Sequence, residues 1–151
     1  MRLTLPRDQV TTLRAALQRG GAREVGGQLF GEQRAPSDFT ITDLTVQPRG
    51  SFTRFIVDLV QAARDALAFF ERTERRYTTF NYIGEWHSHP NFAVRPSDVD
   101  IASMLELVGE ASFKGNFAVL MIARLDADEL TCGAWMFDPC GRAAPVQLEI
   151  A

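Results

Sequence analysis

Glu85-Trp86-His87-Ser88-His89-Pro90 is the stretch that decides how this chain is interpreted, because it ends a predicted strand with two histidines one residue apart. We predict that the strand runs from Phe80 to His87. In a strand, residues i and i+2 point to the same face, so His87 and His89 would lie side by side while Ser88 points away. Neutral imidazole nitrogen is a good zinc ligand. The chain contains 2 histidines in all, and their pairing predicts a metal site.

A carboxylate that could complete the site follows a few residues later. The segment Arg95-Pro96-Ser97-Asp98-Val99-Asp100 is typical of a helix start, with Ser97 as the N-cap and two aspartates in the first turn. If this helix start docks against the end of the histidine strand, Asp100 lies beside both imidazoles. Asp98 is better explained as a simple first-turn charge. Three protein ligands would leave the fourth tetrahedral corner of a zinc ion open, which is typical of a catalytic site.

These positions together resemble the motif of the JAMM (also called JAB or MPN-plus) zinc metalloproteases. The family motif is His-x-His-Pro, a short spacer and Ser-x-x-Asp, with a glutamate on an upstream strand. This sequence matches it from His87 to Asp100, spacing included. The resemblance implies one zinc ion per chain, held by His87, His89 and Asp100. It also implies that Ser97 donates a hydrogen bond to the oxyanion; a helix cap is the alternative role for Ser97.

Two glutamates are candidates for the general base. The resemblance assigns this role to Glu24, on a predicted strand from Glu24 to Phe30 that contains two glycines. Spacing alone would select Glu85 instead, since it lies two residues before His87 on the same strand face. Glu85 could also orient a ligand histidine or be a solvated carboxylate at the rim of the site. We favour Glu24, which would take a proton from the attacking water and deliver one to the leaving amine.

The family hydrolyses isopeptide or peptide bonds that follow ubiquitin or ubiquitin-like tails, and the short stand-alone form resembles its prokaryotic members. The resemblance therefore implies a deubiquitinase-like zinc isopeptidase or peptidase that removes a ubiquitin-like protein, or its C-terminal tail, from a conjugate. Two alternatives remain open: a JAB-type hydrolase of a small peptide or sulfur-carrier adduct, and a non-catalytic MPN scaffold. Only Glu110 to Asn116 separates the Asp100 helix from the next predicted strand, which argues against long insertions that grip linked ubiquitin.

Composition indicates a single domain over residues 1–151. The net charge of −3 argues against nucleic acid as a partner. No apolar run approaches the roughly 20 residues of a membrane span, and the first residues do not resemble a signal peptide. The two cysteines, Cys132 and Cys140, are not spaced as a zinc knuckle, and we expect them to be reduced. We therefore expect a cytoplasmic protein; its oligomeric state is not encoded in any pattern we recognise.

Helical and strand patterns alternate along the chain. This order predicts an α/β fold, a mixed, mainly antiparallel sheet wrapped by helices. The resemblance implies the same architecture, a JAB/MPN-like sandwich similar to that of cytidine deaminases. The predicted helices are Pro6 to Gly20, Asp58 to Arg75, and Ser97 to Val108, the last stopped by Gly109. The other predicted elements are strands Leu3 to Leu5, Phe39 to Val46 with an irregularity near Asp43, Phe52 to Val57, Phe117 to Arg124, Leu130 to Phe137 and Val146 to Ile150, a turn at Pro48 to Gly50 and a polar loop from Gln33 to Asp38.

Overall fold

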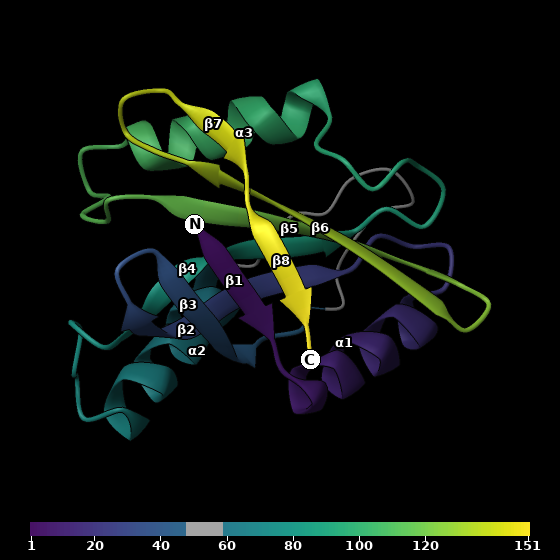
Figure 1. Cartoon of the computed structure of the whole chain (residues 1–151), viewed down its shortest axis with the longest axis horizontal. Coiled ribbons are helices and arrows are strands. Elements are labelled where there is room, and N and C mark those ends of the chain that lie inside the picture. The colour runs from purple at the N-terminus through teal and green to yellow at the C-terminus, as the bar shows by residue number, and fades with distance from the viewer. Residues whose placement is uncertain (48–58) are drawn as a thin grey trace.

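The computed structural model describes residues 1–47 and 59–151, which form an α/β fold with three helices and eight strands (Figure 1). The helices are α1 (Arg7–Gly20), α2 (Leu59–Arg72) and α3 (Asp98–Gly109). The strands are β1 (Arg2–Leu5), β2 (Gly26–Ala35), β3 (Asp38–Leu44), β4 (Phe80–Ser88), β5 (Ala118–Asp126), β6 (Glu129–Phe137), β7 (Ala143–Pro145) and β8 (Gln147–Ile150). In this part of the chain, no helix is long and apolar enough to cross a membrane.

All the strands belong to one mixed sheet with the order β7-β6-β5-β4-β2-β3-β1-β8. Its parallel neighbours are β4 with β5, β1 with β3 and β1 with β8, and the remaining neighbours are antiparallel. The mixed, mainly antiparallel sheet expected from the sequence is therefore confirmed. Strands β7 and β8 lie at opposite ends of this order, yet only Val146 separates them in the chain. Figure 1 shows these two yellow strands following one another across the sheet.

Helices cover both faces of the sheet. Strand β5 makes this plain, since its residues alternate between two buried clusters. Met121 packs in one cluster with Leu13 of α1, and Ile122 packs in the other with Met104 of α3. A strand buried on both faces reads as a continuous apolar run, as the segment 118–123 does. His87 on β4 pairs with Ile122, so the ligand side chain lies on the α3 face of the sheet.

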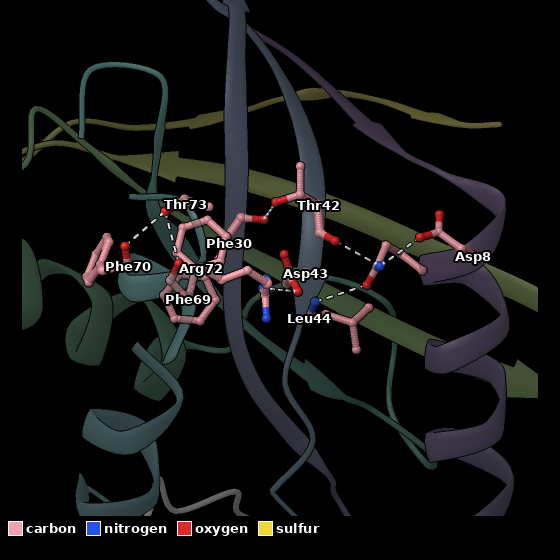
Figure 2. Close-up of polar contacts among 10 residues, drawn as sticks. Asp8, Phe30, Thr42, Asp43, Leu44, Phe69, Phe70, Arg72 and Thr73 are labelled. Carbon is pink, nitrogen blue, oxygen red and sulfur yellow. Dashed lines mark hydrogen bonds and ion pairs between the residues drawn. The ribbon is translucent and has the colours of Figure 1, made fainter. Parts of the chain in front are cut away.

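Strand β3 is tied to a helix on each side (Figure 2). On the α1 side, the Gln9 side chain donates a hydrogen bond to the Thr42 carbonyl oxygen at 2.9 Å and accepts one from the Leu44 N–H at 3.0 Å. On the α2 side, Asp43 forms an ion pair of 2.6 Å with Arg72. Strand β1 pairs only with the first residues of β3, Asp38 to Thr40. Beyond them, the Gln9 side chain takes the place of a neighbouring strand and satisfies backbone groups of β3.

The connection between β2 and β3 differs from our prediction. We predicted a polar loop from Gln33 to Asp38, but β2 continues to Ala35 and β3 begins at Asp38. The hairpin turn contains only Pro36 and Ser37, and Ser37 takes a positive φ of 61°. The end of this hairpin is exposed, so its strand residues are polar and resemble a loop in sequence.

The second helix also ends earlier than predicted. It begins at Leu59 within the described residues and stops at Arg72, and the chain then turns through Glu74 and Arg75, which both have positive φ. Our prediction extended it to Arg75 because charged residues continue the polar face. The predicted strand Phe52 to Val57, the turn Pro48 to Gly50 and Asp58 lie outside the described residues. Strand β7 was not predicted, because three residues ending in proline carry no strand pattern.

Other boundaries agree with the sequence. The irregularity expected near Asp43 is present as a register shift in which Phe30 pairs with Asp43 and Gly31 pairs with Ile41. Strand β8 lies at a sheet edge beside β1, as expected for the C-terminal segment. The first strand, the first helix and the β5–β6 hairpin match their predicted ranges to within two residues.

Candidate metal centre

Three side chains from two elements converge at one end of β4. His87 is on β4, His89 follows its last residue, and Asp100 is in the first turn of α3. The two imidazole Nε2 atoms lie 3.0 Å apart. Asp100 places Oδ1 3.3 Å from Nε2 of His87 and Oδ2 3.5 Å from Nε2 of His89. The start of the third helix therefore lies against the end of the histidine strand, which is the condition under which we expected Asp100 beside both imidazoles.

Glycine on the neighbouring strand allows β2 to approach His87 closely. Gly26 pairs with His87, and a Cβ added there would lie 2.3 Å from the Trp86 carbonyl oxygen and 2.9 Å from the His87 Cβ. No larger residue fits without moving the ligand strand. Trp86 points to the opposite face, where it is fully buried and donates a hydrogen bond to the Thr45 carbonyl oxygen at 2.8 Å. Trp86 is therefore a core residue rather than part of the candidate site.

The second histidine is oriented by backbone groups. The His89 N–H donates to the Ala123 carbonyl oxygen of β5 at 2.9 Å, which continues the pairing of β4 with β5 through this residue. The His89 Nδ1 lies 2.9 Å from the Ala93 carbonyl oxygen, which can only accept, so we assign the proton to Nδ1. In the neutral ring, Nε2 then carries a lone pair and lies close to His87 and Asp100, whereas the protonated ring would donate from Nε2 to Asp100. A carbonyl partner of this kind is the usual support of a metal-binding histidine.

Asp100 is held by the helix cap. Its Oδ2 accepts hydrogen bonds from the Ser97 N–H and the Ser97 hydroxyl, each at 2.7 Å, and its own N–H donates to the Ser97 Oγ at 3.2 Å. This reciprocal pattern is a capping box, and the predicted N-cap role of Ser97 is confirmed. The Ser97 residue remains exposed, so its hydroxyl can be reached from solvent.

The surroundings of Asp100 keep its side chain in the ionised carboxylate form, next to the two imidazole rings. Burial by itself would raise the pKa of Asp100, but hydrogen bonds with His87, His89 and Ser97 lower it far below its ordinary value. The hydrogen bond with Asp100 raises the pKa of His89, although burial opposes this. A raised pKa of His89 beside a lowered pKa of Asp100 shows that this cluster favours a positive charge, which a metal ion can supply.

The donor set fits a zinc ion. One ligand atom from each of His87, His89 and Asp100 lies within 4.8 Å of the others, and within the described ranges these three form the group able to hold a metal. Two imidazoles and a carboxylate are common zinc ligands, and three ligands leave one corner of a tetrahedron open. The arrangement is therefore a candidate catalytic metal centre.

Glu24 lies beside this centre but outside the strand on which we predicted it. Strand β2 begins at Gly26, so Glu24 lies in the segment just before the strand. Its side chain is buried, with 5% of its surface exposed, and its charge contributes to the raised pKa of His89. The group of close ligand atoms consists of His87, His89 and Asp100 and does not include Glu24.

Glu85 shares the strand face of His87 but interacts with Tyr82. Burial raises the pKa of the Glu85 carboxyl, while the charge of His87 and the hydrogen bond with Tyr82 lower it. Burial and the same carboxylate raise the pKa of Tyr82. Strand alternation alone would put Tyr82 and Glu85 on opposite faces, but a register shift between β2 and β4 separates them. Asp98 is exposed in the first turn of α3, as predicted.

Sequence reasoning missed two groups that support this centre. The Ala93 carbonyl orients His89, and the Ser88 hydroxyl accepts a hydrogen bond from the Val25 N–H at 3.0 Å. A serine between two ligand histidines was visible in the sequence, yet strand alternation only showed that it points away from the metal. Its partner is 63 residues distant along the chain, and no local pattern reveals such a contact.

Fold and site together define an α/β domain with a candidate metal centre on its central strand. The chain belongs to the family described as prokaryotic homologs of the JAB domain, whose model matches residues 6–138. The resemblance noted in the sequence is thus confirmed.

Two solved structures share the fold. The solution structure of protein DSY2949 from Desulfitobacterium hafniense has 18% identity and a TM-score of 0.63, and the match covers 99% of this chain and 92% of that one. The crystal structure of AF2198, a JAB1/MPN domain protein from Archaeoglobus fulgidus, has 16% identity and a TM-score of 0.54, covering 99% and 98%. A comparison with curated proteins finds no match.

Proposed function

We propose that this protein is a zinc-dependent isopeptidase or peptidase that releases a ubiquitin-like protein, or part of its C-terminal tail, from a conjugate. The observation that supports this proposal is the convergence of His87, His89 and Asp100 beside the buried carboxylate of Glu24. Membership of the prokaryotic JAB family agrees with the proposal, because the JAMM motif that this chain resembles implies hydrolysis.

The residues have distinct roles in the proposed reaction. His87, His89 and Asp100 hold the zinc ion. When bound, zinc acts as a Lewis acid on a carbonyl oxygen and lowers the pKa of a coordinated water. Glu24 accepts a proton from the attacking water and passes a proton to the leaving nitrogen. Water oxygen becomes bonded to the acyl carbon as the C–N bond breaks, giving a carboxylate and an amine.

Ser97 is proposed as a hydrogen-bond donor to the developing oxyanion. Its hydroxyl is exposed, but its proton points to Asp100 at 2.7 Å, so it must turn toward the substrate to act in this way. The Ser97 N–H also bonds Asp100 at 2.7 Å and would keep the carboxylate in place while the hydroxyl turns. Ser97 could thus cap the helix and serve catalysis in turn.

The proposed substrate is an extended tail with small terminal residues. Such a tail can pass beside a metal ion without steric conflict. Phe92 and Val99, which lie near His89 and Asp100 in the chain, are 48% and 59% exposed, and they offer apolar contact for the residues around the cleaved bond. The Phe92 ring meets the His89 ring edge to face at 6.0 Å.

The decisive experiment compares the zinc-loaded wild-type protein with Glu24→Gln. Glutamine keeps the shape of glutamate but cannot accept a proton. Substrates are bacterial ubiquitin-like proteins with a reporter peptide-bonded after a Gly-Gly tail, and short peptides with the same ending. We expect the wild type to release the reporter and Glu24→Gln to bind zinc fully while losing at least about 100-fold in turnover.

The controls separate the alternatives. Full activity in Glu24→Gln together with an inactive Glu85→Gln would show that the base was assigned wrongly. Cleavage of short peptides alone would favour a small-peptide hydrolase. A fully zinc-loaded wild type that cleaves none of the substrates would contradict the enzymatic proposal and favour a scaffold.

A further inference from the structure

Ser88 stands between the two ligand histidines and faces away from the metal centre. Only 2% of its surface is exposed. Its Oγ accepts a hydrogen bond from the Val25 N–H at 3.0 Å, and its own N–H donates to the Val25 carbonyl oxygen at 2.8 Å. Val25 directly follows Glu24. A single residue therefore connects the strand that carries the histidines with the segment that carries the proposed base.

The hydroxyl takes the place of a backbone acceptor. In a hydrogen-bonded antiparallel pair, each residue donates its N–H to the carbonyl oxygen of the other. Here the Val25 N–H bonds the Ser88 hydroxyl instead. The next N–H, that of His89, bonds Ala123 on β5, as the alternation of N–H groups along a strand requires, so Val25 and Ser88 stand at the last contact between β4 and the β2 segment. The hydroxyl therefore holds Val25 at the end of the pairing between β4 and the β2 segment.

We infer that Ser88 is a positioning residue that fixes Glu24 relative to the metal ligands through its hydrogen bond with Val25. The inference rests on the proposed role of Glu24 as general base. Val25 is 5% exposed, so its N–H cannot turn to bulk water if the hydroxyl is removed. The segment must shift, and a displacement of about 1 Å of a catalytic group can lower turnover by about 100-fold.

The same sheet contains a matched control. Thr45 and Gln28 form a pair of the same kind: the Gln28 N–H donates to the Thr45 Oγ1 at 2.9 Å, and the Thr45 N–H donates to the Gln28 carbonyl oxygen at 3.0 Å. Both pairs hold the β2 segment through a hydroxyl, and only the Ser88 pair adjoins Glu24. Removing either hydroxyl breaks the same kind of hydrogen bond, next to Glu24 in one variant and away from Glu24 in the other.

The experiment compares zinc-loaded Ser88→Ala, Ser88→Thr and Thr45→Val with the wild type on the tail–reporter substrates. We expect Ser88→Ala and Thr45→Val to lower the melting temperature to a similar extent and to retain zinc. Ser88→Ala should lose about 10–100-fold in kcat with KM unchanged. Thr45→Val should stay within about 2-fold of wild type, and Ser88→Thr, which keeps the hydroxyl, should recover most of the lost kcat.

Two further measurements make the inference decisive. In a Glu24→Gln background, adding Ser88→Ala should cost no further turnover, because the effect acts through Glu24. Equal losses in both backgrounds, or unchanged kcat in Ser88→Ala, would overturn it.

If the wild type proves inactive, the proposed function fails, and nuclear magnetic resonance still tests the positioning. The Val25 amide exchange and the Glu24 carboxyl shift should change in Ser88→Ala and stay unchanged in Thr45→Val; no change in Ser88→Ala would refute the inference.

Discussion

At the scale of single residues, Asp100 joins the helix cap to the candidate metal centre. One carboxylate oxygen accepts two hydrogen bonds from Ser97, while the other lies 3.3 Å from the His87 imidazole. The cap restrains the carboxylate before any ion binds, so less side-chain freedom is lost on binding. In its capping role the Ser97 hydroxyl bonds the Asp100 carboxylate, and in its proposed catalytic role it would have to leave this carboxylate.

The ligand set is testable by metal analysis. We expect the wild type to bind one zinc ion per chain and the double variant His87→Ala, His89→Ala to bind none, because the remaining carboxylate cannot hold zinc alone. Asp100→Ala should also lose most of the metal. Asp98→Ala is the control, since Asp98 is exposed in the same helical turn, and its zinc content should equal that of wild type. Stoichiometric zinc in the double variant would refute the site.

Ser97 variants separate capping from catalysis. Asparagine caps helices about as well as serine, whereas alanine costs about 1 kcal/mol. We expect Ser97→Asn to keep the melting temperature and zinc content of the wild type. Its longer amide should misplace the donor and lower turnover by about 10²–10³. Thermal melts beside steady-state assays provide the measurement. Near-normal turnover in both Ser97→Asn and Ser97→Ala would leave Ser97 as a helix cap alone.

At the scale of elements, β3 depends on side chains where it lacks a strand neighbour. β1 pairs with β3 only from Arg2 to Thr4, opposite Asp38 to Thr40. On that side the later part of β3 is hydrogen-bonded by Gln9 from α1. An aromatic cluster anchors the other side, where Phe30 of β2 stacks on Phe69 of α2 at 4.6 Å. Figure 2 shows this central strand pair held between the two helices.

We expect Gln9→Ala to destabilise the fold by about 1–3 kcal/mol, because it removes both hydrogen bonds to β3 and leaves the part-buried Leu44 N–H without its acceptor. Gln18→Ala on the same helix is the control; Gln18 is exposed, and its loss should change stability by less than about 0.5 kcal/mol. Chemical denaturation of both variants measures the difference. Equal stability of the two would show that Gln9 does not support β3.

At the scale of the whole molecule, the centre joins segments that are far apart in the chain. Of the candidate ligands, His87 lies on β4, His89 directly follows it and Asp100 lies on α3. The proposed base precedes β2, and β5 accepts a hydrogen bond from the second histidine. Strands β2, β4 and β5 are adjacent in the middle of the sheet. A metal ion bound here would stabilise the folded chain as a unit, since the unfolded chain does not bring these ligands together.

Zinc should therefore raise the melting temperature. A ligand at 100 times its dissociation constant stabilises the folded state by about 2.7 kcal/mol. For a chain of this size we expect a rise of about 5–10 °C, reversed by a chelator. Calorimetry with and without zinc measures it. The double variant His87→Ala, His89→Ala should show no rise, and a rise of equal size there would place the stabilising metal elsewhere.

Features that depend on near neighbours in the chain were predictable from the sequence. Side chains two residues apart on a strand share one face, so the two histidines could be identified as a pair. A serine cap followed by an aspartate three residues later is also a local pattern, so Ser97 and Asp100 could be identified as well. Their docking was then confirmed. The helix and strand boundaries held where the apolar pattern was strong, as in β5 and β6. They failed in the β2–β3 hairpin, whose exposed strands carry polar residues.

Other features were decided only by the tertiary structure. The family resemblance singled out Glu24, but its place before β2, its burial and its link to Ser88 arise from a strand pairing that spans 63 residues. The pairing of Tyr82 with Glu85 depends on a register shift that strand alternation cannot reveal. The strand order, including β7 and β8 at opposite ends, has no local signal either. Local sequence patterns specify which face a side chain takes, and long-range packing decides what it meets there.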